Sequence, residues 1–419
     1  MRPTLIFAAE TLNLAEVTRM LEIAKVAKRS FEPVFLSYDG AGRNHGVIAA
    51  EGFEIVPLQP QLGPEDVERF WAADRMERLT DFFSDAMLQA RVDAEVALYN
   101  TRGAVGVVTG FCLSTSLSAR VAQIPLVWIA QTTWLHEHAE RYAEWPDFAD
   151  YAPVRLIPEG LRNRLGAALT PLGFWSWSAG LNRVGRTRGL PPFRGGTFLE
   201  GDITLYAEPE GFSETPIPER LRGRAAFVGP LIARLDVPVP EAVRTLPRDL
   251  PIIYFAMGSS GIEEVVRAVL RGFAGKPVRV IAPVGELLSG DHERPDNVVV
   301  TGWLPAHEVN QMADVSVLHG GIGTLMTAAL AATPIVGIGN GNPEQEWNLG
   351  CLVRKGMAVQ LHKRRLQPTE VVDQALRLLG DADAKAAARA FAAECARWDG
   401  PENATRELET RLLASHRCG

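Results

Sequence analysis

Residues 315–332 read VSVLHGGIGTLMTAALAA: a short apolar strand runs through a histidine and a glycine-rich turn into a helix rich in alanine and leucine. Glycines let a ligand approach the backbone closely, and the first N–H groups of a helix have no partners within it. Such a helix start attracts anions through its free donors and its dipole. His319 adds a side-chain donor, and Thr324 adds a hydroxyl and an N–H. The stretch therefore predicts a strand-turn-helix unit of an α/β fold with a phosphate-binding turn.

Three further strands of this half end in polar or glycine-rich turns. Strand 252–257 leads to Gly258-Ser259-Ser260-Gly261, strand 298–301 leads to Gly302-Trp303-Leu304-Pro305, and strand 334–338 leads through a glycine-rich loop to Pro343-Glu344-Gln345-Glu346-Trp347-Asn348. In open parallel sheets, ligands bind outside the carboxyl ends of the strands. We therefore expect four strand ends to converge on one ligand crevice.

The N-terminal half alternates strands and helices in the same way. Strand candidates are 5–8, 34–37, 55–57, 105–109 and 126–130, with helices near 15–28 and 114–121. This alternation predicts a parallel, doubly wound α/β sheet. Proline-rich sequence between 227 and 240 interrupts it, and three helix candidates follow Pro368: 371–379, 384–398 and 402–413. We therefore predict domains at 1–235 and 236–395 and a C-terminal segment at 396–419.

The order of the turns resembles the donor half of the GT-B glycosyltransferases: a Gly-Ser turn, then Gly-Trp-Leu-Pro, then His-Gly-Gly-x-Gly-Thr, then Glu-Gln with a trailing Asn. The likeness is greatest to the inverting family of UDP-glycosyltransferases and bacterial natural-product glycosyltransferases. It covers nearly the whole chain and is most specific from Trp303 to Asn348. It implies two Rossmann-like domains facing a central cleft, with the acceptor on 1–235, the donor on 236–395, and the last helix packed back on the first domain.

By this likeness, Trp303 stacks on the nucleotide base, the Leu304 backbone reads the base edge, and Glu344 and Gln345 bind hydroxyls of the transferred sugar. The diphosphate would be held by the helix start and the serine turn. The implied donor-binding residues are Ser259, Ser260, Trp303, Leu304, His319, Gly321, Gly323, Thr324, Glu344, Gln345 and Asn348. Ala306 departs from the family, where many relatives have Gln, so the choice between uracil and thymine stays open.

Each of these residues also has a plainer explanation. Trp303 could be a core aromatic residue, and His319 could be a buried histidine bonded to a carbonyl group. Glu344 and Gln345 could form an ordinary first helical turn, where acidic residues suit the dipole. Their occurrence together, in this order, favours the interpretation as a sugar-nucleotide site.

The catalytic base is where the chain departs from the family. Relatives have a Gly-His pair at the start of the first helix and an Asp at a later strand end that orients this histidine. Here Glu16 falls at the histidine position, and the strand end Val108-Thr109-Gly110-Phe111 lacks the Asp. A carboxylate needs no second group to fix a tautomer, so the paired loss is coherent if Glu16 is the general base. Its alternative role is that of an acidic residue at a helix N-terminus. Glu10, His136 and His138 are fallback candidates.

The acceptor is expected on the N-terminal domain, near the ends of its strands. Candidate acceptor-binding residues are Asn13, Phe111, Gln131 and Trp134, whose aromatic members suit a flat or apolar acceptor. The segment 169–180, with its three aromatic residues, predicts either a lid over the acceptor or an amphipathic patch that touches a membrane. We favour the lid, because no adjacent basic run is dense enough to anchor a membrane patch.

Length and composition set further limits. The 419 residues suffice for two domains of roughly 200 residues each. The hydrophobic content of 47% and charged content of 22% are typical of a globular protein, and no segment has the apolar length of a membrane span. Residues 5–9 read as a first strand rather than a signal peptide, and the four cysteines, Cys112, Cys351, Cys395 and Cys418, show no paired spacing. We expect a cytoplasmic protein with reduced thiols.

Together these patterns predict an inverting glycosyltransferase that moves a sugar from a UDP- or dTDP-sugar to a small-molecule acceptor: a secondary metabolite, a phenol or a nucleoside. No Asp-x-Asp pair stands at a strand end near the donor turns, so we expect no metal, and no cofactor besides the donor co-substrate. The net charge of −7 disfavours nucleic acid as a partner. Stable membrane insertion is not expected, and a homodimer stays open. Rival functions are a non-catalytic sugar-nucleotide-binding auxiliary protein and a sugar-nucleotide 2-epimerase.

Overall fold

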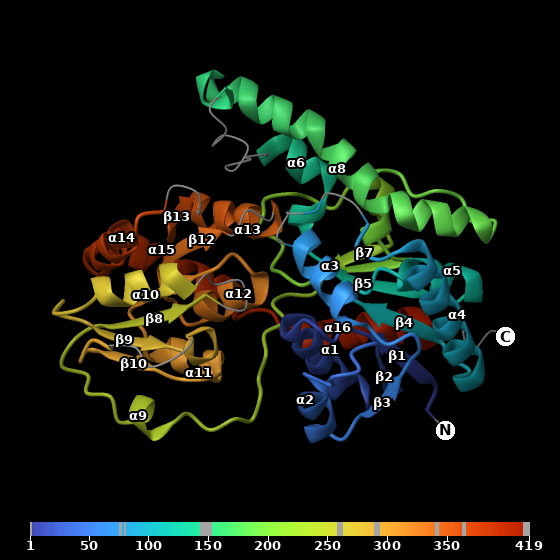
Figure 1. Cartoon of the computed structure of the whole chain (residues 1–419), viewed down its shortest axis with the longest axis horizontal. Helices are drawn as coiled ribbons and strands as arrows, with labels where there is room; N and C mark the ends of the chain where they lie inside the picture. Colours follow the sequence, from blue (N-terminus) through green and yellow to red (C-terminus); the bar gives the residue numbers. More distant parts are fainter. Residues whose placement is uncertain are drawn as a thin grey trace. The chain divides into compact units, whose positions relative to one another are not determined.

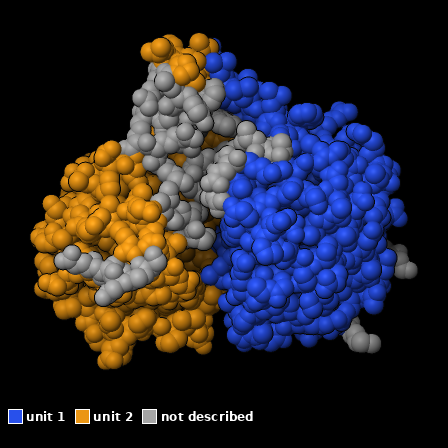
Figure 2. Space-filling view, viewed as in Figure 1, with its two compact units in different colours: residues 1–143, 163–231, 398–419 blue, residues 144–162, 232–397 orange. Residues whose placement is uncertain are grey.

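The computed structural model describes residues 2–74, 78, 81–142, 153–257, 263–288, 294–339, 343–362 and 366–413. The chain forms two compact units, coloured separately in Figure 2. Unit 1 comprises 1–143, 163–231 and 398–419, and unit 2 comprises 144–162 and 232–397. The units thus divide at 231 and 397, where the sequence placed boundaries at 235 and 395, and 144–162 group with unit 2.

Unit 1 is built on a seven-stranded sheet in the order β3-β2-β1-β4-β5-β6-β7, with every pairing parallel (Figure 1). Its strands are β1 (Thr4–Ala8), β2 (Glu32–Ser37), β3 (Glu54–Pro57), β4 (Gly106–Thr109), β5 (Leu126–Ala130), β6 (Ile203–Tyr206) and β7 (Ala225–Phe227). The main helices are α1 (Leu14–Ala27), α2 (His45–Ala50), α3 (Pro64–Asp74), α4 (Asp85–Arg102), α5 (Thr115–Ala122), α6 (His136–Tyr142), α8 (Glu159–Thr187), which begins in unit 2, and α16 (Gly400–Leu408).

Unit 2 has a six-stranded parallel sheet in the order β10-β9-β8-β11-β12-β13. Its strands are β8 (Ile252–Ala256), β9 (Arg279–Ala282), β10 (Val298–Val300), β11 (Val315–Leu318), β12 (Ile335–Gly339) and β13 (Ala358–His362). Its helices are α9 (Glu241–Arg244), α10 (Glu263–Gly272), α11 (Ala306–Val309), α12 (Ile322–Leu330), α13 (Pro343–Arg354), α14 (Pro368–Gly380) and α15 (Ala382–Cys395). The predicted doubly wound α/β fold is therefore confirmed in both units.

The strand order of each sheet reverses direction at one place. In unit 1 the reversal lies between β1 and β4, and in unit 2 it lies between β8 and β11. Connections leave the two strands of such a pair in opposite directions, which opens a crevice at their carboxyl ends. The segments that follow β1 and β4 contain Glu16 and Gly110, and the segment that follows β11 begins with His319. Both candidate sites therefore start at the topological switch points of the two sheets.

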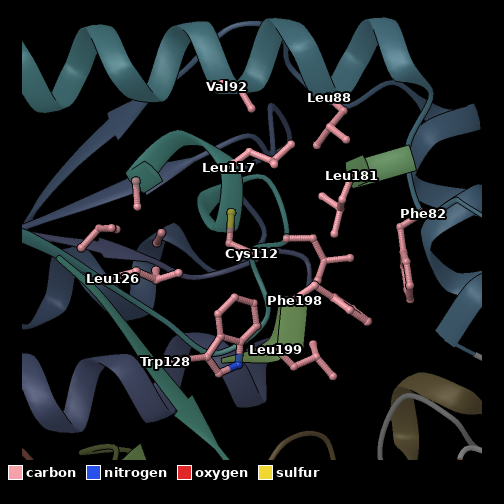
Figure 3. Close-up of a cluster of buried hydrophobic side chains, with 14 of the residues drawn as sticks. Phe82, Leu88, Val92, Cys112, Leu117, Leu126, Trp128, Leu181, Phe198 and Leu199 are labelled. Carbon is pink, nitrogen blue, oxygen red and sulfur yellow. The ribbon is translucent and has the colours of Figure 1, made fainter. Parts of the chain in front are cut away.

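The core of unit 1 joins the sheet to helices α4, α5 and α8. Figure 3 shows part of this core, with Leu88 and Val92 of α4, Leu117 of α5, Leu181 of α8 and Trp128 of β5 among the labelled side chains. All five are buried. Alternation of buried strands and helices with one apolar face is what brings these residues together.

Helix α16, near the C-terminal end of the described residues, belongs to unit 1, where it lies beside α1 (Figure 1). Arg29, just after α1, pairs with Glu402 at 2.7 Å and with Glu409 at 2.8 Å. Gly400 lets the start of α16 approach the segment that follows β7: a Cβ at Gly400 would lie 2.2 Å from the carbonyl oxygen of Pro230. Because the ion pairs are solvent-exposed and contribute little, backbone contact at Gly400 is the tighter constraint on this helix.

Candidate functional site

The glycine-rich turn of unit 2 forms an uncapped helix start. Gly321 is the N-cap of α12 and supplies no side-chain hydrogen bond, so the N–H groups of Ile322, Gly323 and Thr324 have no partner from a cap. His319 directly precedes this turn. Desolvation by burial lowers the pKa of His319, and its buried Nδ1 atom has no hydrogen-bond partner among the described residues. The ring is therefore neutral at pH 7, when it can donate through one N–H.

Gly320 brings the start of α13 against this turn. A Cβ at position 320 would lie 2.2 Å from the carbonyl oxygen of Gln345, a contact that no side chain can make. The Asn348 amide donates to the Gly320 carbonyl at 3.2 Å and to the Glu344 carboxylate at 3.2 Å. The beginnings of α12 and α13 thus meet at one backbone contact, as expected for helices that follow the neighbouring strands β11 and β12.

The three polar residues at the start of α13 have different surroundings. Glu346 is buried against Gly339, and its carboxylate accepts a hydrogen bond from the Gln360 amide at 2.5 Å. The Oε1 atom of Gln345 is buried and has no hydrogen-bond partner. Glu344 is half-buried and bonded to Asn348. The arrangement leaves Gln345 with an unused acceptor, while Glu346 is committed to the fold.

Trp303 follows β10 and is 40% exposed, so it is not a core residue. Its neighbour Leu304 is buried at 2% exposure. This alternation fixes the backbone through Leu304 while the indole of Trp303 stays accessible for stacking. Ser259 and Ser260, the remaining candidates for the diphosphate, lie outside the described residues.

In unit 1, Glu16 occupies the third position of α1, which Asn13 caps by accepting the N–H of Ala15 at 2.9 Å. The residue is buried at 7% exposure. One carboxylate oxygen, Oε1, lies 3.4 Å from Arg19, and the other, Oε2, is buried without a hydrogen-bond partner. A Cβ at Gly110 would lie 1.9 Å from Oε2. The carboxylate therefore fills the space that a side chain after β4 would take, at the switch point of the sheet.

Glu10, the fallback base, has a different environment. Its Oε2 atom pairs with Arg91 at 2.9 Å, and both side chains are buried at 1% exposure or less. Arg91 also lies over the ring of Tyr38, at 3.9 Å from its centroid, and over that of Phe83, at 4.4 Å. The two buried charges neutralise each other. Removing either side chain would leave an unpaired charge in the core and would strongly destabilise the fold. The structure gives Glu10 a role in holding Arg91 in place.

Comparison with known proteins gives these sites a context. Residues 280–410 match the family model described as erythromycin biosynthesis protein CIII-like, C-terminal domain. The chain is 29% identical over 401 residues to a PGL/p-HBAD biosynthesis glycosyltransferase of Mycobacterium tuberculosis, covering 93% of this chain and 88% of the relative. It is 28% identical over 395 residues to a PGL/p-HBAD biosynthesis rhamnosyltransferase of Mycobacterium bovis, covering 93% and 84%.

Solved structures agree over nearly the full length. The glycotransferase of kitacinnamycin superposes with a TM-score of 0.71 at 17% identity, covering 98% of this chain and 99% of that one. The glycosyltransferase VinC, in complex with dTDP, gives 0.68 at 18% identity, covering 98% and 100%. The spinosyn rhamnosyltransferase SpnG, complexed with thymidine diphosphate, gives 0.66 at 16% identity, covering 98% and 100%. The chain is a GT-B glycosyltransferase. The fold and enzyme class expected from the sequence are confirmed.

One relative of this glycosyltransferase is named as inactive. It is an inactive PGL/p-HBAD biosynthesis glycosyltransferase of Mycobacterium bovis, 28% identical over 277 residues, covering 64% of this chain and 70% of the relative.

The acceptor candidates of the glycosyltransferase lie among aromatic residues. Phe111 contacts Phe82 edge to face, with ring centroids 5.4 Å apart, and Trp134 contacts Trp177 at 5.9 Å. Phe82 and Trp177 are 5.8 Å apart, which joins the two pairs. Phe111 and Trp134 are half-buried. They are thus the partly accessible members of an otherwise buried aromatic cluster.

The polar acceptor candidates differ in availability. The Asn13 side chain caps α1. Gln131 follows β5, is buried at 3% exposure, and has an Oε1 atom without a hydrogen-bond partner. The structure therefore brings Gln131 to the carboxyl end of the sheet with an unused acceptor, whereas Asn13 is occupied by the helix it begins.

The two fallback histidines have different surroundings. His138 is fully buried, and its Nδ1 lies 2.7 Å from the hydroxyl of Thr215. His136 is the first residue of α6 and is half-buried. The buried position of His138 is that of a structural residue, so of these two histidines His136 is the one that keeps access to solvent.

The segment 169–180, expected to form a lid, is part of the long helix α8. Phe174 and Trp177 are buried in the core of unit 1, at 4% and 8% exposure, while Trp175 is 67% exposed. Ring contacts join Phe174 to Trp134 and to Phe198. The aromatic residues therefore divide between the two faces of a packed helix, which the aromatic content of the segment did not reveal.

Two acidic residues of unit 1 that the sequence did not single out are buried. Glu95 of α4 is fully buried and accepts hydrogen bonds from Tyr38 and Ser114. Glu208, just after β6, accepts hydrogen bonds from the Thr132 backbone and hydroxyl. Desolvation raises the pKa of Glu95 and raises that of Glu208 to about 7. An acidic residue directly after an apolar strand was the signal available for Glu208.

No group of three His, Cys, Asp or Glu side chains in the described part of the chain could hold a metal ion. Cys112, Cys351 and Cys395 are buried, and none of these three forms a disulfide. Cys418 lies outside the described residues.

Proposed function

We propose that this glycosyltransferase transfers a sugar, with inversion and without a metal, from a dTDP- or UDP-sugar to a small-molecule acceptor. The observation that carries the donor assignment is the uncapped start of α12 beside His319, pressed against the start of α13. Two neighbours of the same fold, VinC and SpnG, were both solved in complex with thymidine diphosphate (dTDP). Their likeness supports a thymidine nucleotide as the first donor to test.

The free N–H groups of α12 and the neutral His319 would hold the departing diphosphate. Fixed donors aimed at a developing negative charge stabilise the transition state without reorganising. Trp303 supplies an exposed ring on which the nucleotide base can stack, and Gln345 supplies a buried, unused hydrogen-bond acceptor for a sugar hydroxyl. Asn348 orients Glu344 for the same sugar.

Glu16 is the proposed general base. Its Oε2 takes the proton of the acceptor hydroxyl as the acceptor oxygen forms a bond to the anomeric carbon. The bond from that carbon to the diphosphate breaks, and its electron pair leaves with the nucleoside diphosphate. The arrangement of Glu16 against Gly110 supports this role, because the carboxylate takes the space of a residue after β4 and keeps one oxygen unbonded.

A carboxylate base favours an acidic acceptor. Carboxylates bind protons weakly near neutral pH, and a phenol, with a pKa of about 10, gives up its proton more readily than an aliphatic alcohol. The half-buried rings of Phe111 and Trp134 suit a flat molecule. Among the acceptor classes considered, we therefore favour a phenol.

The donor assignment is tested by calorimetric titration of the full chain with dTDP, UDP, GDP and ADP. We expect dTDP or UDP to bind, His319→Ala to weaken that binding at least about tenfold, and His319→Asn, which keeps a donor, to lose less. Equal affinity of wild type and His319→Ala for the preferred nucleotide would remove His319 from the donor site. No binding of any nucleotide would overturn the proposed donor class.

The base is tested by turnover of Glu16→Gln with a panel of phenols and a matching dTDP- or UDP-sugar. We expect kcat to fall about 10²- to 10⁴-fold while donor affinity is unchanged. Glu22→Gln is the matched control, since Glu22 is a buried glutamate of the same helix that pairs with Lys25 at 2.6 Å. Gly110→Ala should also lose turnover, because its methyl group displaces the carboxylate of Glu16.

The same variants distinguish the rival functions. A non-catalytic binding protein would bind the nucleotide and turn over no acceptor in the wild-type form. Full turnover by Glu16→Gln would leave the enzyme class unchanged and would show that another residue is the general base, with His136 as the next candidate. An epimerase would release nucleotide from the donor without any acceptor.

A further inference from the structure

Helix α8 carries most of the exposed apolar side chains in the described part of the chain. Nine large hydrophobic residues are exposed in the whole of the described chain, and six of them lie between 156 and 175. Five of these six belong to α8, and Leu156 lies just before it. The six are Leu156, Leu161, Leu165, Leu169, Leu172 and Trp175, with exposures from 39% to 86%. Single exposed apolar residues are common on protein surfaces, but a cluster of this kind marks an interaction site.

Five of these residues form one stripe along the helix. Leu161, Leu165, Leu169, Leu172 and Trp175 follow one another at intervals of four, four, three and three residues. At 3.6 residues per turn they fall within an arc of about 120°. We call these five residues the α8 stripe. Their regular spacing makes a continuous apolar surface rather than scattered side chains.

The opposite face of α8 is packed inside unit 1. Thr170, Phe174, Trp177 and Leu181 are buried, and all four lie across the helix from the α8 stripe. Arg183 further anchors this end through contacts of 2.8 Å with Asp81 and 2.7 Å with Asp85. A surface helix of a globular protein is normally polar on its outer face. Since the inner face already supplies the packing, the apolar outer face is not needed for folding.

The charges of α8 indicate the nature of the partner. The helix contains four arginines and one glutamate, in a chain of net charge −7. By helical spacing, Arg162 and Arg164 fall on either side of the α8 stripe. An apolar stripe bordered by arginines is the pattern of helices that lie in the interface of an anionic lipid bilayer.

We propose that the α8 stripe binds the surface of an anionic membrane, with α8 lying in the plane of the interface. The leucines and Trp175 would enter the boundary between headgroups and acyl chains, and Arg162 and Arg164 would contact lipid phosphates. No helix in the described residues is long and apolar enough to cross a bilayer, so the contact is peripheral. Such docking would hold the glycosyltransferase beside acceptors that partition into lipid.

A second copy of the chain fits this face less well. A twofold interface pairs the same patch with itself, so it would bring the arginine-bordered stripes of two copies together. The only acidic residue of α8 is Glu159, at its first position. The helix thus offers its own copy little negative charge, whereas an anionic bilayer supplies it along the whole stripe.

Cosedimentation of the full chain with vesicles tests the proposal. We expect binding to vesicles of equal parts phosphatidylglycerol and phosphatidylcholine, weaker binding to phosphatidylcholine alone, and a loss at high salt. The double variant Leu165→Glu, Leu172→Glu should bind the anionic vesicles at least about tenfold more weakly. Val237→Glu is the matched control, because Val237 is also exposed, at 36%, and lies outside the α8 stripe.

Three outcomes would overturn the proposal. The first is a wild-type chain that fails to sediment with anionic vesicles, and the second is a double variant that sediments as well as Val237→Glu. The third is a wild-type dimer that the double variant converts to a monomer while vesicle binding is absent, which would assign the stripe to self-association. Both substituted leucines are exposed, so the circular dichroism of the variant should match that of the wild type.

Discussion

Alanine substitution at two glycines of one turn separates folding from ligand binding. Gly320 and Gly323 are three residues apart, and neither has a positive φ, so alanine strains the backbone conformation at neither. A Cβ at Gly320 would lie 2.2 Å from the carbonyl oxygen and 2.6 Å from the Cα of Gln345. A Cβ at Gly323 would meet no atom within 4 Å. The same chemical change therefore collides with backbone at one position and meets open space at the other.

We expect Gly320→Ala to lower the free energy of unfolding and Gly323→Ala to leave it unchanged or raise it. The Gly320→Ala methyl group needs about 1 Å more room, and α13 cannot easily move, since Asn348 bonds to the Gly320 carbonyl and Leu349 is buried over Gly337. Overpacking of this kind costs about 1 to 3 kcal/mol. Gly323→Ala lies inside α12 and should be neutral or should stabilise the helix by up to about 1 kcal/mol. The two variants should thus differ by about 1 to 4 kcal/mol.

Urea unfolding followed by circular dichroism measures the stability of each variant, and calorimetry measures nucleotide affinity. Gly320→Ala should unfold at a lower urea concentration with an unchanged slope. Gly323→Ala should keep its stability and lose nucleotide affinity, because its methyl group enters the open space at the helix start. If Gly320→Ala unfolds within about 0.5 kcal/mol of the wild type, the contact between the starts of α12 and α13 does not constrain the fold as argued.

Two further predictions concern single side chains. Trp303→Ala should weaken nucleotide binding by about 1 to 3 kcal/mol through lost base stacking, while stability changes little because the ring is 40% exposed; calorimetry and urea unfolding check both. Burial raises the pKa of Glu208 from 4.5 to about 7, so the folded chain keeps a proton that the unfolded chain releases between these values. The free energy of unfolding should therefore fall as the pH rises through this window, and Glu208→Gln should remove that slope; unfolding at about pH 5 and about pH 8 measures the difference.

The donor half was the part of the fold most open to prediction. The strand 315–318 and its turn occur as β11 and the start of α12, because apolar strands and glycine turns are local signals. The role of Gly320 was not predicted. Its contact with Gln345 joins residues that are 25 positions apart, and only the pairing of β11 with β12 brings them together.

The candidate base illustrates the same division. Motif alignment placed Glu16 in the position of the missing histidine and noted the missing Asp at the end of β4. The physical link between these two changes became visible only in the folded chain, where the Glu16 carboxylate fills the space beside Gly110. The sequence also offered Glu10 as a fallback base, but its buried pairing with Arg91 depends on α4, which the sequence had not connected with β1.

The sequence alone determined the parallel α/β class and the glycine turn that leads into α12, because strand, turn and helix signals depend on neighbours within a few residues. The tertiary structure decided which polar groups are already bonded and which are left for a ligand. It also decided that Phe174 and Trp177 are core residues while Trp175 and the neighbouring leucines of α8 face outward. Burial depends on what packs against each face of a helix, and residues distant in the sequence supply that packing.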